Sequence, residues 1–341
     1  MEDFKCLKAI WCYSVKMTPQ TARTHFRTYD AELDLSTNSP RLLREIRKDY
    51  GSFECTGSIE VDGRVRILET DQPFPIAVPE YAIREDLLPP DAAIFRMDGL
   101  RYFVEEEKRI FRVDLEKNDV LGYLRSSSRF TEFLRFLLKW MLIKALEKKG
   151  TAFLHGSGVE RDGTSIFFVG PSGYGKTHML VTLLTEGYRF ITDDTILLSG
   201  RRVRPFHIRS KIARDLLEQF PILRKGLNRK STCIPKVGWL VDLEDIFPSV
   251  MEEVKPSKLF YVYVWNSEKT KVEPVPKKEM LARLLHAYSM EVRSSPWFNY
   301  EQDQAMKNIF PNYNSFVEEA DCYKVFAGSR SLMTVKEVEE S

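Results

Sequence analysis

The spacing of apolar residues changes near residue 127, and this change divides the chain into two parts. Before it, short stretches alternate apolar and polar residues, which is the period of half-buried β-strands. Residues 57–68 and 101–113 alternate in this way around turn residues, as β-hairpins do. Residues 42–48 predict a short helix, and the prolines within residues 73–90 predict a loop. The first part is therefore expected to be rich in β-structure.

The second part opens with a helical stripe at residues 130–146, where apolar residues recur every three or four positions. Phe136, Trp140 and Ile143 widen this stripe, so the helix is expected to be buried on more than one side. Charged residues interrupt it, and no run approaches the roughly 18 apolar residues that a membrane span needs. The sequence predicts a core helix within residues 127–148 and no association with a membrane.

Short apolar runs follow this helix, separated by turns or by further helices. The expected strands are 152–159, 165–169, 189–192, 195–198, 237–243, 258–265 and 322–327, and the expected helices are 177–186, 277–292 and 301–320, the last broken at Pro311. Strands that alternate with helices are typical of an α/β core. The predicted domains are a β-rich N-terminal domain at 1–126, an α/β catalytic domain at 127–334 and a charged, solvated tail at 335–341.

Composition narrows the class of protein. Hydrophobic residues make up 43% and charged residues 29%, which is the balance of a globular chain rather than a disordered one. Lys and Arg number 51 against 49 Asp and Glu, so the net charge gives no support for nucleic-acid binding. The first residues are acidic and lack a basic leader, and the scattered cysteines lack zinc spacing. A cytoplasmic protein with reduced thiols is expected.

The strongest chemical signal is the stretch SIFFVGPSGYGKT at residues 165–177, which fits the Walker A pattern between a buried strand and a helix. Its glycines allow backbone N–H groups to point at phosphate oxygens, and the helix N-terminus favours the same anion. Lys176 is expected to reach the β- and γ-phosphates of ATP, and the Thr177 hydroxyl to bind Mg²⁺. The predicted nucleotide site comprises Gly170, Pro171, Ser172, Gly173, Tyr174, Gly175, Lys176 and Thr177.

A second signal is YRFITDD at residues 188–194, an apolar strand that ends in Asp193 and Asp194. Because this strand follows the loop after one short helix, it is expected to return both carboxylates to the phosphates. There one carboxylate can hold Mg²⁺ while the other accepts the proton of an attacking hydroxyl. A polar turn is the structural alternative, since Asp is common in turns, but the neighbouring loop favours a site.

Other polar residues leave alternatives open. His155, in the stretch LHGSG, lies one hairpin before the loop strand, so strand pairing should bring it near the loop. A structural histidine is an equally good interpretation of its spacing. The basic cluster Arg201, Arg202, Arg204, Arg209 and Lys211 can contact phosphate or form a solvated hairpin. The basic stretch 224–236 is either a phosphate-contacting loop or ordinary surface.

Taken together, residues 152–198 resemble the catalytic domain of the HPr kinase/phosphorylase family and its HPr-kinase-like relatives. The shared order is a histidine-glycine strand, an Asp-Gly hairpin, the P-loop, a helix, a Gly-Tyr-Arg turn and a double aspartate. The resemblance implies a P-loop catalytic fold related to the nucleotide-binding part of phosphoenolpyruvate carboxykinases. It also implies that the γ-phosphate of ATP, bound with Mg²⁺, passes to a serine hydroxyl of a protein or peptide.

The resemblance further implies roles for single residues. Asp193 would be the general base, Asp194 a metal-side carboxylate, His155 an active-site neighbour, and Lys176 and Thr177 the nucleotide and metal residues. The founding enzymes form hexamers, so a homo-oligomer is one arrangement that the resemblance implies. The β-rich N-terminal domain is then the candidate for substrate recognition.

The chain also departs from that family. The segment SGRRVRPFHIRSKIARDLLEQFP, after the aspartates, lacks the glycine- and isoleucine-rich stretch linked to phosphorolysis, and residues 1–125 do not resemble the family's N-terminal domain. An acceptor other than HPr is therefore expected, as in relatives that phosphorylate precursor peptides of lasso-peptide pathways. A small-molecule hydroxyl kinase and an ATP-sensing module without turnover stay open as alternatives. The aspartate pair favours an enzyme, because a sensor needs no base.

Overall fold

The computed structural model describes residues 21–57, 60–87, 92–105, 107–126, 131–234, 237–265, 267–294, 302–328 and 337–341. Contacts divide the chain into two compact units. The first unit comprises Met1–Phe26, Leu33–Glu45 and Glu54–Phe130, and the second comprises Arg27–Glu32, Ile46–Phe53 and Thr131–Ser341. The main division therefore lies at the start of the long helix, while two short earlier segments group with the second unit.

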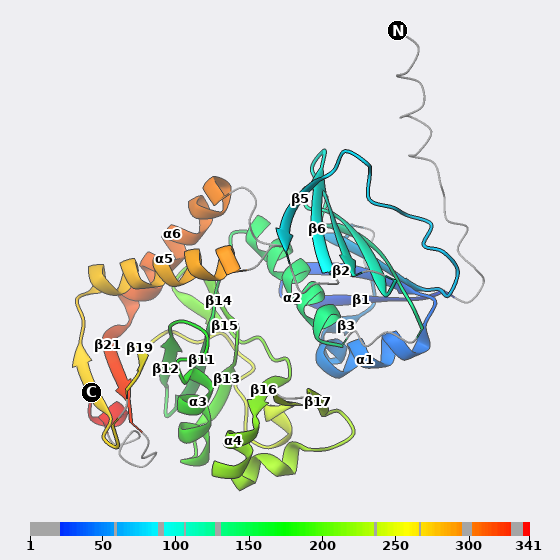
Figure 1. Ribbon diagram of the computed structural model, residues 1–341. Helices are drawn as coiled ribbons and strands as arrows, with labels where there is room; N and C mark the ends of the chain where they lie inside the picture. Colours follow the sequence, from blue (N-terminus) through cyan, green and yellow to red (C-terminus); the bar gives the residue numbers. More distant parts are fainter. Residues whose placement is uncertain are drawn as a thin grey trace. The chain divides into compact units, whose positions relative to one another are not determined.

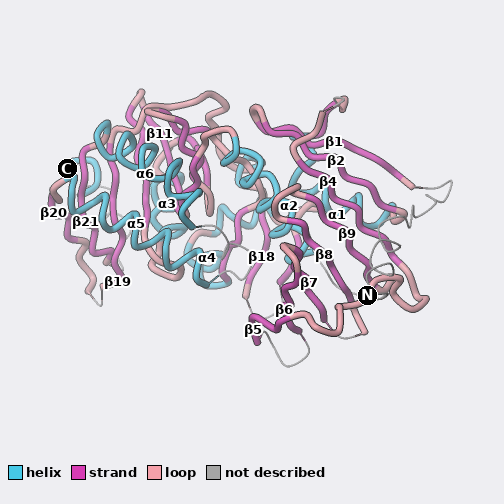
Figure 2. The backbone as a smooth tube through the Cα atoms, turned by 90° about the horizontal axis from the view of Figure 1, so that it is seen from above, coloured by secondary structure: helices cyan, strands magenta, loops and turns pink. Residues whose placement is uncertain are grey.

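The first unit is built on a nine-stranded sheet with the order β3-β1-β2-β4-β9-β8-β7-β6-β5. Figure 2 shows β4, β9, β8, β7 and β6 following one another in this order. Its elements are β1 Ala22–Thr28, β2 Ala31–Thr37, α1 Pro40–Tyr50, β3 Glu54–Cys55, β4 Gly63–Glu69, β5 Ile83–Leu87, β6 Ala92–Met97, β7 Leu100–Glu105, β8 Arg109–Asp114 and β9 Asp119–Leu124. Residues 27–28 of β1, 31–32 of β2 and 46–50 of α1 belong to the segments that group with the second unit. Leu33, Leu35, Val65 and Phe111 are fully buried in this sheet, as the alternating pattern predicts.

One of the two predicted hairpins in this unit is present. β7 and β8 pair in antiparallel fashion, so the hairpin at residues 101–113 is confirmed. The hairpin at 57–68 is wrong, because β4 pairs in parallel with β2 and β9. Gly63 is needed there for space and not for a turn: a Cβ on it would lie 2.5 Å from the side-chain nitrogen of Asn118. Alternation identifies a strand, but it does not identify the strand's partner.

The second unit contains the remaining helices and strands, grouped around a six-stranded sheet with the order β13-β11-β12-β19-β21-β20. Its strands are β10 Ala152–Leu154, β11 Gly156–Arg161, β12 Thr164–Val169, β13 Arg189–Thr192, β14 Ile196–Ser199, β15 Arg202–Arg204, β16 Ser210–Ala213, β17 Thr232–Ile234, β18 Gly238–Val241, β19 Lys258–Val264, β20 Lys271–Pro274 and β21 Asp321–Ala327. Its helices are α2 Thr131–Lys148, α3 Lys176–Thr185, α4 Arg214–Gln219, α5 Lys277–Ser294 and α6 Gln302–Glu319, with 3-10 turns at Gly51–Phe53, Pro221–Gly226 and Leu243–Asp245.

Both faces of the six-stranded sheet are covered, which explains the apolar run at residues 166–169 of β12. Phe168 belongs to the core cluster that includes Leu180 and Leu183 of α3. Its neighbour Phe167 points to the opposite face and packs edge-on against Phe316 of α6, with ring centroids 5.5 Å apart. Figure 1 shows α3 on one side of these strands and α5 and α6 on the other. The mixed α/β character of the second part is confirmed.

The single strand predicted at residues 152–159 is wrong, because the chain changes sheets within it. β10 pairs with β14 in a three-stranded sheet, whereas β11 pairs with β12 and β13 in the six-stranded sheet. His155 is the residue between the two strands. Periodicity carries no signal of such a break, because the residues on both sides of it are buried.

Two other expectations are corrected. Helix α6 continues through Pro311 instead of breaking there. Ile309 and Tyr313, on either side of the proline, are both fully buried, so packing holds the two halves in line. The final residues are not a solvated tail: Val338 is fully buried, and the Tyr323 hydroxyl donates to the carbonyl oxygen of Ser341 at 2.6 Å.

A buried ion pair ties distant parts of the second unit together. Arg209, whose side chain is 0% exposed, donates two hydrogen bonds to the Asp49 carboxylate, at 2.9 and 2.6 Å. Arg135 of α2 also donates to this carboxylate, at 3.2 Å, and its guanidinium contacts the backbone carbonyl of Arg209. One carboxylate thus compensates two guanidinium groups away from water, where an unpaired charge is strongly destabilising.

We expect Asp49→Asn to lower the free energy of unfolding by about 3–5 kcal/mol, because two buried guanidinium groups lose their counter-charge. Urea denaturation monitored by circular dichroism measures this loss. The matched control is Glu132→Gln, which removes the carboxylate from the exposed Lys211–Glu132 pair, with side chains 49% and 56% exposed. That change should cost less than about 1 kcal/mol. Equal effects of the two substitutions would contradict the assigned role of Asp49.

Candidate functional site

The loop between β12 and α3 has the backbone geometry that its glycines predict. Gly170, Gly173 and Gly175 have φ angles of 139°, 81° and 88°, which residues with a Cβ rarely adopt. A Cβ on Gly170 would also lie 3.1 Å from the carbonyl oxygen of Val262. The loop therefore keeps this course because glycine stands at these three positions, and it leads directly into the N-terminus of α3.

Lys176, the first residue of α3, is 6% exposed and turns its side chain back under the loop. Its ammonium donates to the carbonyl oxygens of Gly170 and Pro171, at 2.8 Å each. Burial lowers the pKa of Lys176 to about 8, although Asp193 and Asp194 oppose the shift. A buried cation that contacts neutral carbonyl groups is stabilised by any anion placed beside it.

Strand register brings three predicted site segments to one edge of the sheet. β11 pairs with β12 so that Gly156 faces Val169, which places His155 beside the start of the loop. On its other side β11 pairs with β13, and Gly158 faces Thr192, the residue before Asp193. The carboxyl ends of β12 and β13 therefore meet the amino end of the antiparallel strand between them.

Asp193 lies next to the predicted metal ligand of the loop. The Thr177 hydroxyl donates to Oδ1 of Asp193 at 3.2 Å. Asp193 is 5% exposed, and burial, together with the negative charge of Asp194, raises the pKa of its carboxyl. A buried carboxylate with a raised pKa has the proton affinity that a general base requires.

Asp194 has a different environment, in which cations surround it. Its φ of 67° is in the left-handed region, which residues other than glycine, asparagine and aspartate rarely adopt. Lys139 of α2 donates to its carboxylate at 2.5 Å. Although burial raises the pKa of Asp194, Lys139 and His155 hold it well below its usual range. This carboxylate stays ionised and is a poor proton acceptor.

His155 is held in place by Asp194. Its Nδ1 lies 2.9 Å from the Asp194 carbonyl oxygen and 3.2 Å from Oδ1 of the same residue. Because a carbonyl oxygen only accepts, Nδ1 donates its proton in this contact, and Nε2 is left for another partner. The ring is 20% exposed, so it can contact a bound molecule as well as the protein.

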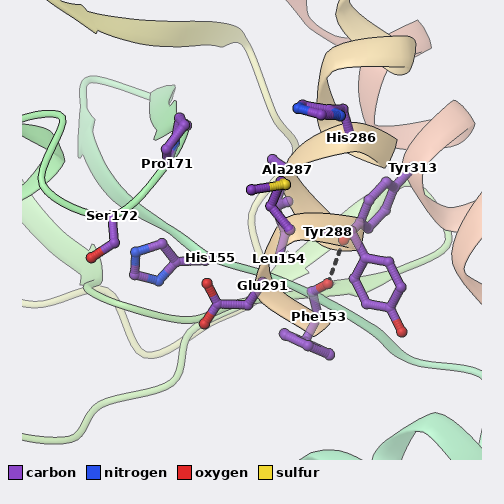
Figure 3. Close-up of a pocket in the computed structure, with 12 residues that line it drawn as sticks. Phe153, Leu154, His155, Pro171, Ser172, His286, Ala287, Tyr288, Glu291 and Tyr313 are labelled. Carbon is purple, nitrogen blue, oxygen red and sulfur yellow. Dashed lines mark hydrogen bonds between the residues drawn. The ribbon is translucent and has the colours of Figure 1, made fainter. Parts of the chain in front are cut away.

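These groups surround one cavity of about 630 Å³. The predicted site residues that line it are His155, Ser172, Gly173, Gly175, Lys176, Thr177, Asp193 and Asp194. Gly170 and Pro171 line a smaller adjoining pocket together with His155 and Ser172 (Figure 3). Tyr174 lines neither of them, and its side chain is exposed.

Several lining residues were not predicted from the sequence. They come from other elements: Arg135 and Lys139 from α2, Asp215 from α4 and Glu291 from α5. One feature of the sequence could have identified Lys139 as a site residue: it interrupts a helix whose apolar residues are buried. A lysine within such a helix needs a counter-charge, which Asp194 supplies. The acidic and basic residues on the other elements look like ordinary surface charges in the sequence.

The predicted basic cluster is mostly structural. Arg204 pairs with Asp30 at 3.1 Å and with Glu253 at 2.8 Å, and Arg209 is buried against Asp49. Arg201 pairs with a glutamate of α6. Of the cluster, Lys211 lines the cavity, where it can contact an anion. The basic stretch at 224–236 contributes no lining residue among those that the structure describes.

The chain is similar in sequence to a known protein over part of its length. No protein-family model matches the chain. A segment of 81 residues, 24% of this chain, is 32% identical to an HPr kinase/phosphorylase of Malacoplasma penetrans (strain HF-2). The match spans a quarter of that relative's length (25%).

A solved structure, the HPr(Ser) kinase/phosphatase from Coxiella burnetii, aligns with 55% of this chain and 91% of its own, at 12% identity and a TM-score of 0.25. Over the described residues, no helix combines the length and apolarity needed to cross a membrane. The match in sequence confirms the resemblance predicted from the motifs: this chain carries a segment that is HPr kinase-like.

Proposed function

We propose that the protein is an ATP-dependent kinase that phosphorylates a serine hydroxyl of a protein or peptide. The observation that supports this most directly is the convergence of Lys176, Thr177, Asp193, Asp194 and His155 on one cavity. Phosphoryl transfer depends on positioning and charge stabilisation, so it needs a phosphate-binding loop, a metal ligand and a base within reach of one another. The HPr kinase-like segment favours the same class of reaction.

The residues present fit Mg²⁺ and a nucleoside triphosphate. Lys176 is a buried cation whose contacts with Gly170 and Pro171 are neutral carbonyl groups, so the β- and γ-phosphates would supply the missing anion. The Thr177 hydroxyl and the Asp193 carboxylate, 3.2 Å apart, are oxygen ligands of the kind that Mg²⁺ prefers. The bound nucleotide would supply the phosphoryl group, and Mg²⁺ would neutralise charge that develops on it.

The two aspartates would then divide the work. Asp193, with its raised pKa, is suited to accept the proton of the acceptor hydroxyl. Asp194 would stay ionised beside Lys139 and orient His155 through the contact at Nδ1. The contact of Asp193 with Thr177 also places Asp193 close to the metal position, so its carboxylate can act at the metal and at the hydroxyl.

The first test is mass spectrometry of the full-length protein with Mg·ATP and a panel of acceptors. The panel contains serine peptides, HPr-like proteins and free hydroxyl metabolites. We expect a gain of one phosphoryl group on a serine peptide or protein. Transfer only to a metabolite would instead support a small-molecule kinase, and tight ATP binding without transfer to any acceptor would support an ATP sensor.

Lys176→Ala should weaken Mg·ATP binding by at least about tenfold and abolish transfer, because the variant loses the loop's buried cation. Isothermal titration calorimetry measures the affinity, and the mass-spectrometric assay measures transfer. Lys278→Ala, at an exposed position on α5, is the control and should behave as the wild type. Wild-type affinity in Lys176→Ala would remove this lysine from the nucleotide site.

The pH dependence of nucleotide binding follows from the lowered pKa of Lys176, about 8 in the free protein. Phosphate binds the protonated lysine, so affinity should be constant below that pKa and fall by up to roughly tenfold for each pH unit above it. Binding at pH values near the pKa should also take up a proton, which calorimetry in two buffers of different ionisation enthalpy detects. Lys176→Arg stays charged and should lose this dependence. A flat pH profile in the wild type would contradict the protonation argument.

Asp193→Asn should reduce transfer by at least about 100-fold, because it removes the proposed base. It should also weaken Mg·ATP binding, because the same carboxylate is a proposed Mg²⁺ ligand. Asp194→Asn should reduce transfer less and should weaken the hold on Lys139 and His155. Single-turnover rates at saturating Mg·ATP compare the two variants directly. If Asp194→Asn is the slower of the two, the roles of the aspartates are reversed.

A further inference from the structure

A second, smaller pocket of about 190 Å³ adjoins the catalytic cavity. Its back wall is aromatic: Phe153 packs edge-on against Tyr288 with ring centroids 5.6 Å apart, and Tyr288 packs edge-on against Tyr313 at 6.2 Å. The Tyr313 hydroxyl donates to the backbone carbonyl of Phe153 at 2.6 Å, the contact drawn as a dashed line in Figure 3. Tyr288 is 7% exposed and Tyr313 is 0% exposed, so this wall is fixed by packing.

The mouth of this pocket shares residues with the catalytic cavity. His155, Ser172 and Glu291 line both of them. Figure 3 shows His155 and Ser172 at one side of the pocket and the tyrosines at the other. A molecule that fills the pocket would therefore extend directly into the space where the proposed base and the loop meet.

The pocket lies at the start of the phosphate loop, away from the part of the larger cavity where the nucleoside is expected. It borders Gly170, Pro171 and Ser172, the beginning of the loop. The ammonium of Lys176 lies at this same end, bonded to the carbonyls of Gly170 and Pro171. Because this lysine would bind the β- and γ-phosphates, the terminal phosphate belongs at the start of the loop. The rest of the nucleotide would extend past His178 and Leu216, which line the larger cavity.

The size of the pocket also limits its occupant. A protein cavity of about 150 Å³ holds one benzene molecule. A pocket of about 190 Å³ therefore suits one branched aliphatic or aromatic side chain, and it is too small for a nucleoside with its phosphates. Most of the lining side chains are apolar or aromatic, namely Phe153, Leu154, Pro171, Ala287, Tyr288, Met290 and Tyr313, and the titratable ones besides the tyrosines are His155, His286 and Glu291. The apolar and aromatic majority fits such a group.

We infer that this pocket selects the acceptor: it takes a bulky apolar side chain adjacent to the serine whose hydroxyl is phosphorylated. The inference rests on the proposed kinase function and specifies its substrate class. The aromatic wall would bind the side chain, while the neighbouring serine would lie at the mouth, between His155 and the end of the loop. Met290, which is 52% exposed at the rim, can adjust to side chains of different shape.

The test uses the full-length protein with the non-hydrolysable analogue Mg·AMPPNP and two series of capped dipeptides, N-acetyl-Ser-X-amide and N-acetyl-X-Ser-amide, with X as Gly, Leu or Phe. Binding is measured by calorimetry, and transfer is measured separately with Mg·ATP. In at least one series, the Leu or Phe peptide should bind at least about tenfold more tightly than the Gly peptide, since burying such a side chain from water is worth at least that factor.

Ala287→Leu fills the pocket from α5 without changing any proposed catalytic residue. It should reduce the preference for Leu or Phe over Gly to less than about threefold and leave the affinity for Mg·AMPPNP unchanged. Ala282→Leu is the matched control: it makes the same change at an exposed position of the same helix, outside the pocket, and should keep the preference.

Each outcome decides the inference separately from the kinase proposal. If the wild type prefers the Leu or Phe peptide and Ala287→Leu removes that preference, the pocket binds the apolar side chain as inferred. This holds even if no phosphate is transferred and the kinase proposal fails. Equal binding of the Gly, Leu and Phe peptides, or no binding of any, overturns the inference, and transfer without preference overturns it while the kinase proposal stands. If Ala287→Leu weakens Mg·AMPPNP binding and the control Ala282→Leu does not, the pocket belongs to the nucleotide site, and the inference is also overturned.

Discussion

The register of β11 between β12 and β13 is the constraint on which the candidate site depends. Two glycines make it possible. A Cβ on Gly156 would lie 2.7 Å from the carbonyl oxygen of Phe168, and a Cβ on Gly158 would lie 2.6 Å from the ring of Phe167. A larger residue at Gly156 would collide with the backbone of β12, and one at Gly158 would have to displace the buried ring of Phe167. This close approach sets His155, the loop and the aspartate pair at one edge of the sheet.

The site concentrates charges that are costly to bury. Lys176 has a lowered pKa and Asp193 a raised one, so burial disfavours the charged form of each in the free protein. Asp194 differs, because Lys139 compensates it directly. A fold selected only for stability would not keep a buried carboxylate next to a second one. Perturbed groups of this kind cluster at functional sites, where a bound ligand supplies the missing counter-charge.

Local signals were enough to predict the parts of the site but not its full environment. The loop, its helix and the strand that ends at Asp193 follow from glycine spacing and apolar runs, and the structure has each of them. The sheet change at His155 was missed, because both strands are buried and they follow one another with one residue between them. Lys139 and Glu291 come from helices distant in sequence, and only tertiary packing brings them to the cavity. The parallel pairing of β4 was missed for the same reason, since alternation carries no information on partners.

The change of sheet at His155 gives the site its division into two spaces. β10 contributes Phe153 to the aromatic wall of the pocket, where it packs against Tyr288. β11 pairs with β12, the strand that leads into the phosphate loop. His155, the residue between these strands, lines the pocket as well as the cavity. Under the proposed function, one short segment would therefore couple the group that identifies the acceptor to the groups that transfer phosphate. A histidine suits this position, because one ring nitrogen can be held by Asp194 while the other contacts the acceptor.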